Sequence, residues 1–153
     1  MTFLLTLDED KLEEIIPLLP KYEQKIAAAA PIFEIEGKRL EAIMRTLPHY
    51  QSSYDQSFQE MKGLEEWVIN IKDKKIGKLW RTYNEGYSRQ LSTKDIGMYI
   101  AAEKDIVEIN QILIEIVALK NNLSSIVESL KQLGWMVGHI TKLRISEMQD
   151  AIL

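Results

Sequence analysis

The chain has 153 residues, a formal net charge of −4 and no cysteine. Its length is typical of one domain with a real hydrophobic core, and the lack of cysteine excludes disulfides, thiolate chemistry and Cys-type zinc sites. The acidic balance argues against polyanion binding over the whole surface, so any nucleic-acid site has to be local or repeated by assembly.

The N-terminal residues and the apolar clusters predict a protein without a signal peptide or membrane segment. The first ten residues have four apolar side chains after the initiator, no basic stretch and then an acidic run. The apolar run 112–119 is interrupted by Glu115 and is far shorter than the roughly 20 residues that cross a bilayer. We therefore expect a cytoplasmic protein.

All four prolines lie in the first third of the chain, which is predicted to form short elements. The spacing of apolar residues indicates a short acidic helix over about 8–16 and a second helix over about 21–30. Residues 32–36 partly alternate apolar and acidic side chains, which is typical of a short half-buried strand that needs a partner. Residues 38–47 return to helical spacing.

The chain has no proline after Pro48, so long helices can form from there onward. Pro48 suits the first turn of a long helix, in which apolar residues recur at threes and fours from Tyr50 to Ile71. After Lys72 the apolar spacing shifts, which changes the local supercoil or lets the helix leave its partner. Gly86 is expected to end this helix.

A second long helix is predicted from Ser92, because Ser92 and Asp95 form a Ser-x-x-Asp pattern like a capping box. We expect this helix to run to about Leu133 and to end at Gly134. A C-terminal helix is predicted for residues 135–152.

These elements together predict an all-α fold. It consists of a long antiparallel helical hairpin with short N-terminal helices, a short strand near 32–36 and a C-terminal helix. The stretch 112–119 is apolar nearly all round, and such a helix is buried on every side, whereas a hairpin covers only one. Either the N-terminal elements or other copies of the chain cover the rest, and the second alternative favours a homo-oligomer.

The segment 72–94 carries the clearest functional signal. It has seven Lys or Arg residues against two acids, a balance of +5, so the remainder of the chain sums to −9. Phosphate backbones attract cations and unpaired bases stack on aromatic rings, so this basic and aromatic segment predicts a site for single-stranded nucleic acid. The residues expected at the site are Lys72, Lys74, Lys75, Lys78, Arg81, Tyr83 and Arg89. The alternative is a solvated helix face whose aromatics point into the core.

Trp80 has two interpretations within this segment. It is either a core residue in one stripe with Ile76, Tyr83 and Tyr87, or a partly exposed platform for base stacking. The chain offers no catalytic arrangement, because its two histidines lack metal-ligand spacing and it has no glycine-rich phosphate loop. We expect neither an enzyme nor a cofactor or metal site.

Several pieces of sequence stand in a recognisable order and spacing. They are Phe33–Leu40, Leu47–Pro48 with Tyr54, Lys78–Tyr83, Leu91–Ile100 in the pattern L-x-x-K-D-I-x-x-Y-I, Gly134–Trp135, His139–Ile140 and Leu143–Arg144. Together they resemble the UvsY family, the recombination mediators of T-even-type bacteriophages. The resemblance covers roughly residue 31 to the end. It implies a helical DNA-binding and oligomerisation domain over 31–153, preceded by an N-terminal extension of unknown role over 1–30.

The resemblance implies a ring-forming homo-oligomer, a hexamer or heptamer, without catalytic activity. It further implies that the chain binds single-stranded DNA and contacts a phage single-strand binding protein. In place of that protein it would load a RecA-like recombinase of the UvsX type. In the family's DNA-contacting basic pair, Lys78 matches the first cation, whereas the second falls on Leu79 or Trp80, with Arg81 one residue away. The competing interpretation is a non-enzymatic helical scaffold or adaptor without nucleic-acid binding.

Overall fold

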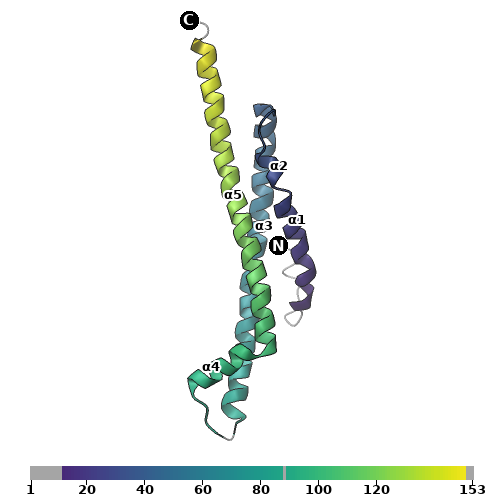
Figure 1. Cartoon of the computed structure of the whole chain (residues 1–153), viewed down its shortest axis with the longest axis vertical. Coiled ribbons are helices and arrows are strands. Elements are labelled where there is room, and N and C mark those ends of the chain that lie inside the picture. Colours follow the sequence, from purple (N-terminus) through teal and green to yellow (C-terminus); the bar gives the residue numbers. More distant parts are fainter. Residues whose placement is uncertain (1–11, 88, 151–153) are drawn as a thin grey trace. The chain divides into compact units, whose positions relative to one another are not determined.

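The computed structural model describes residues 12–87 and 89–150, and all secondary structure in these residues is helical (Figure 1). Two 3₁₀ turns, Leu12–Glu14 and Ile16–Leu18, come before the helices. The helices are α1 (Leu19–Ala27), α2 (Ala30–Phe33), α3 (Leu40–Glu85), α4 (Thr93–Ala102) and α5 (Lys104–Asp150). The predicted all-α class and the short N-terminal helices are therefore confirmed. No described helix is long and apolar enough to cross a membrane.

The chain divides into two compact units, and both long helices contribute to each. The first unit contains residues 1–20 and 60–119, and the second contains residues 21–59 and 120–153. The expected division at residue 30 rested on the extent of the family resemblance and stays a prediction.

In the first unit, α3 and α5 run antiparallel. Lys75 of α3 pairs with Asp105 at the start of α5, and Tyr83, two turns further along α3, bonds to the earlier residue Glu103. The core of this unit is formed by apolar side chains at every third or fourth position of the helices. Two of its buried residues come from α4. The fully buried side chains are Ile15, Met61, Leu64, Val68, Ile96, Ile109 and Ile116.

In the second unit, α3 and α5 are also antiparallel. Gln51 Nε2 donates to the carbonyl of Leu130 at 3.5 Å, and the earlier residue Leu47 of α3 lies against the later residue Gly134 of α5. The buried side chains of this unit are Tyr22, Ala29, Ile43, Leu47, Tyr54, Leu123, Leu130, Leu133 and Val137. In both units, pairing of the long helices confirms the expected helical hairpin.

The strand predicted for residues 32–36 is wrong. Residues 30–33 form α2, Glu34 is extended, and Gly37 turns the chain with a φ of 75°. Pro31 lies in the first turn of α2, where its missing N–H costs no helical hydrogen bond. A lone strand needs a paired neighbour, and the described residues supply no other strand.

The predicted boundaries of the long helices need correction at two places. Pro48 lies inside α3, which already begins at Leu40, because the face that buries Ile43, Leu47 and Tyr54 continues across the proline. Gly134 does not end a helix but lies inside α5, where its missing side chain leaves room for Leu47. The expected separate C-terminal helix is therefore the last part of α5.

Two further expectations about helices differ from the structure. The second long helix is interrupted at Glu103, whose extended backbone separates α4 from α5. The helix predicted for 8–16 lies partly outside the described residues, and its remainder is 3₁₀ turn rather than α-helix. Pro17, which stands in the second turn, cannot donate an N–H to a longer helix.

Two predicted helix ends are confirmed. Gly86 directly follows the end of α3, and its N–H donates to the carbonyl of Thr82 at 2.9 Å. Ser92 caps α4, because its hydroxyl accepts a hydrogen bond from the Asp95 N–H at 3.2 Å. The Ser92 hydroxyl also donates to the Asp95 carboxylate at 2.6 Å, which holds the capping pair together.

Candidate nucleic-acid interface

Three predicted cations form one exposed face of α3, which we call the basic face: Lys74, Lys78 and Arg81. At about 100° per residue, these positions lie within roughly 60° of one another around the helix axis. The half-buried Ile76, Leu79 and Tyr83 lie on the opposite side of the helix. The shift of apolar register after Lys72 therefore leaves these three cations facing the solvent, and the exposed Glu85 ends the positive strip one turn after Arg81.

Two other predicted cations, Lys72 and Lys75, are half-buried and lie away from the basic face. The Lys75 Nζ lies 2.6 Å from an Asp105 carboxylate oxygen on α5. This hydrogen-bonded ammonium holds the pKa of Asp105 below its usual value. The charge of Lys75 is thus balanced within the protein by Asp105, which makes it a weaker attractor for phosphate than an exposed cation such as Lys78 or Arg81. Arg89 is exposed in the connection between α3 and α4.

Three tyrosines cluster where α3 ends, and we call them the tyrosine cluster: Tyr83, Tyr87 and Tyr99. The Tyr83 ring stacks against both Tyr87 and Tyr99, with centroid distances of 5.7 Å and interplanar angles of 15° in each pair. Tyr83 itself is half-buried, whereas Tyr87 is 55% and Tyr99 50% exposed. The open aromatic surface therefore belongs mainly to Tyr87 and Tyr99.

The hydroxyl of Tyr83 donates a short hydrogen bond to the carboxylate of Glu103. This bond is the main reason that the pKa of Tyr83 rises to about 12. Tyr99 is held in place because its helix buries Ile96 and Ile100 on the side next to it. The cluster is thus a fixed arrangement of rings rather than three independent side chains.

Trp80 is half-buried, and both sequence interpretations of its role stay predictions. Tyr99, by contrast, was absent from the predicted site because it lies beyond the basic segment. The sequence signal that could have indicated Tyr99 was the helix end at Gly86. A chain that turns back there brings the next helix against the end of α3. The described residues contain no group of three or more side chains suited to hold a metal ion.

The fold and the site define an all-α protein with two long paired helices and a basic face near the end of the first. The sequence matches no protein-family model and no curated protein. The structure is similar to the crystal structure of the bacteriophage T4 recombination mediator protein UvsY, with a TM-score of 0.68 and 16% sequence identity. The match covers 84% of this chain and 98% of the T4 chain. The chain therefore has the UvsY fold.

Proposed function

We propose that this protein is a non-enzymatic recombination mediator that binds single-stranded DNA through the basic face of α3. It would promote the loading of a RecA-like recombinase in place of a single-strand binding protein. The observation that carries the proposal is a solvent-facing strip of cations, Lys74, Lys78 and Arg81, on a chain that shares its fold with a recombination mediator.

The basic face supplies contacts to phosphate, and the tyrosine cluster supplies surfaces for bases. Cations on one side of a helix follow a phosphate backbone without reading its sequence. Tyr87 and Tyr99 offer open rings near the end of the same helix, and stacking on such rings tolerates any base. A strand that passes around the end of α3 would contact both features.

The proposed mediator works through weak sites repeated in one assembly. A ring of six or seven copies would present as many basic faces, and linkage raises the overall affinity far above that of one site. Each contact can still release separately while a recombinase nucleates on the strand. The strand is thereby held and organised without being trapped, as replacement of one protein by another requires.

The test is fluorescence anisotropy with a labelled oligo(dT) strand over a series of salt concentrations. The wild type should bind, with log K falling by roughly 0.7 per phosphate contact for each tenfold increase in salt. Lys78→Ala combined with Arg81→Ala should weaken binding and flatten that slope, because fewer counterions are released. No binding by the wild type at low salt would favour the scaffold interpretation instead.

A matched control removes two exposed cations from a different part of the chain. Lys142→Ala with Arg144→Ala, both on α5, should leave the affinity and the salt slope unchanged. If this pair weakens binding while the α3 pair does not, the DNA site lies on α5. Tyr99→Ala should weaken binding but keep the salt slope, because stacking releases no counterion.

A further inference from the structure

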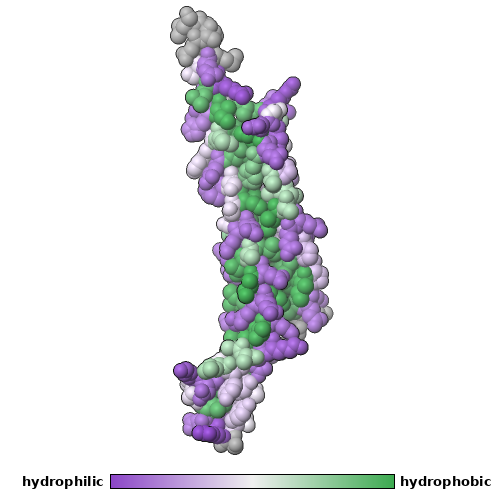
Figure 2. All heavy atoms as spheres, in the orientation of Figure 1, coloured by the Kyte–Doolittle hydropathy of each residue, from purple (hydrophilic) through white to green (hydrophobic). Residues whose placement is uncertain are grey.

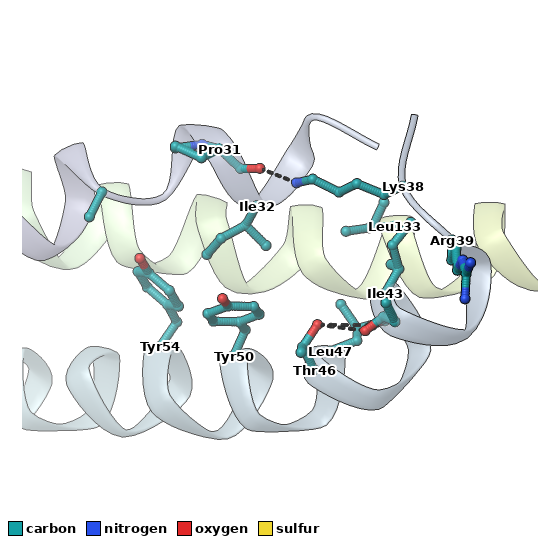
Figure 3. Close-up of a pocket in the computed structure, with 12 residues that line it drawn as sticks. Pro31, Ile32, Lys38, Arg39, Ile43, Thr46, Leu47, Tyr50, Tyr54 and Leu133 are labelled. Atoms are coloured by element: carbon teal, nitrogen blue, oxygen red, sulfur yellow. Dashed lines mark hydrogen bonds between the residues drawn. The ribbon is translucent and has the colours of Figure 1, made fainter. Parts of the chain in front are cut away.

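The second unit contains an apolar cavity of about 580 Å³ that is open to solvent on one side. Its floor consists of buried side chains, namely Ile43, Leu47, Tyr54 and Leu133. In Figure 3, Tyr50 and Tyr54 project from α3 toward Pro31 and Ile32 on the opposite wall. A cavity of this size accepts one or two large apolar side chains.

The rim of the cavity is cationic although the chain as a whole is acidic. Lys38 and Arg39 both line it, and the described lining residues include no carboxylate. The Lys38 Nζ donates to the Pro31 carbonyl at 2.9 Å, which fixes this charge across the mouth (Figure 3). The Arg39 side chain is exposed and carries five donors in a planar fork that suits a carboxylate.

We propose that this cavity is a docking site for a protein partner, and that it receives an acidic peptide segment with a bulky apolar side chain. The apolar side chain fills the space above Leu47 and Tyr54, and a neighbouring carboxylate binds Arg39. The inference does not depend on DNA binding, because none of the lining residues belongs to the basic face or the tyrosine cluster.

The openness of the cavity and its charge favour a peptide over other occupants. Sites for small molecules enclose most of their ligand, whereas this cavity leaves one side in solvent, where a peptide backbone can lie. An apolar anchor in a pocket with polar groups at the rim is the usual arrangement of a peptide-binding surface. The cationic rim attracts an acidic segment, and the apolar floor distinguishes this cavity from the basic face of α3, which attracts anions by charge alone.

The test uses a fluorescein-labelled peptide, Asp-Glu-Asp-Phe-Glu-Glu-Leu-Phe, titrated with the full-length protein. We expect saturable binding, and we expect binding to be lost for the same peptide with lysine at every acidic position. Arg39→Glu should weaken binding roughly tenfold or more, because it replaces an attractive charge at the contact with a repulsive one. Arg45→Glu is the control, since Arg45 is exposed on α3, six residues after Arg39, but does not line the cavity.

A second variant separates docking in the cavity from attraction to surface charge. Ala42→Trp fills the cavity from an exposed position of α3 and should abolish binding while the melting temperature is retained. Equal binding of the acidic and basic peptides, or binding that survives Ala42→Trp or Arg39→Glu, would overturn the proposal. A fall in the native mass of Ala42→Trp would overturn it too, because a second copy of the chain would then occupy the cavity.

Discussion

At the scale of single residues, Lys25 contributes a structural charge to the second unit. Its Nζ donates to the Ser53 carbonyl and the Ser53 hydroxyl, each at 2.8 Å, and to the Ser57 hydroxyl at 2.7 Å. The same ammonium lies 5.1 Å from the centre of the Tyr54 ring, whose hydroxyl donates to the Lys25 carbonyl at 2.9 Å. This half-buried lysine therefore links α1 to α3 by hydrogen bonds of both its side chain and its backbone carbonyl.

Lys25→Met should destabilise the protein by about 1–3 kcal/mol, because methionine retains the apolar stem but loses the charge-assisted hydrogen bonds. The measurement is the free energy of unfolding from urea denaturation. Lys21→Met is the matched control, since Lys21 is exposed on the same helix, and its effect should stay within about 0.5 kcal/mol. Equal effects of the two substitutions would show that the Lys25 contacts add nothing to stability.

Tyr83 should make the folded protein less stable at alkaline pH. Its hydrogen bond to Glu103 raises its pKa from 10.0 to about 12, so the folded state favours the neutral phenol. The resulting stability is fully present below pH 10 and is lost as the pH rises from 10 to about 12. Burial also raises the pKa of Tyr54, so spectrophotometric titration should show late tyrosine ionisations, of which Glu103→Gln moves only that of Tyr83 to lower pH. An unchanged titration in Glu103→Gln would contradict this assignment.

At the scale of elements, the helix ends that depend on local chemistry could be predicted from the sequence. Ser92 caps α4 with its own side chain, and Gly86 follows the last turn of α3 as expected. Pro48 and Gly134 were misassigned, since each lies in a long helix that tertiary burial continues through an unfavourable residue. Propensity acts within a few residues, whereas buried apolar residues recur along α3 from Ile43 to Val68.

For the candidate site too, features within one segment could be predicted from the sequence, and contacts between helices could not. The basic face follows from helical spacing within one segment, so Lys78 and Arg81 could be placed together from the sequence alone. The pairing of Lys75 with Asp105 and the stacking of Tyr99 on Tyr83 could not, because both depend on how separate helices pack. Packing between helices thus decides that Lys75, one of the predicted cations, is paired with a carboxylate of another helix.

Gly134 and Gly138 provide a matched test of helix packing within α5. A Cβ on Gly134 would lie 3.2 Å from Leu47 Cδ2, whereas a Cβ on Gly138 would meet nothing within 4 Å. Gly138→Ala should raise stability by about 0.5–1 kcal/mol, because alanine is the better helix former. Gly134→Ala should gain clearly less or lose stability, since Leu47 has to move. Equal gains in thermal melting would show that α3 and α5 do not approach closely there.

At the scale of the whole molecule, several large apolar side chains of the single chain are exposed to solvent. The stretch 112–119 was expected to be buried on all sides, yet Ile114 is 69% exposed while Ile116 is buried. On α5, Met136 is 44% and Leu143 64% exposed. Figure 2 shows hydrophobic residues reaching the surface between hydrophilic ones. This exposure supports the proposal that copies of the chain assemble, because an interface between copies would remove large apolar side chains from water.

The last prediction tests that assembly on α5. Met136 and Leu143 are seven residues apart, so they face nearly the same direction, as residues of a helix–helix seam do. Native mass spectrometry of the wild type should give six or seven chains, and Met136→Glu with Leu143→Glu should shift the mass toward one chain with unchanged helix content. Both substitutions place charge in a surface that would be buried only in the assembly.

The control for this variant adds the same charge on another side of α5. Ser124→Glu with Lys142→Gln also changes the net charge by −2, and both positions are exposed and lie about 100–120° from the Met136 and Leu143 face. The control should keep the wild-type mass, because added repulsion alone is too weak to separate a buried apolar interface. If both variants dissociate, general charge governs assembly. If neither dissociates, the subunits meet through a different surface.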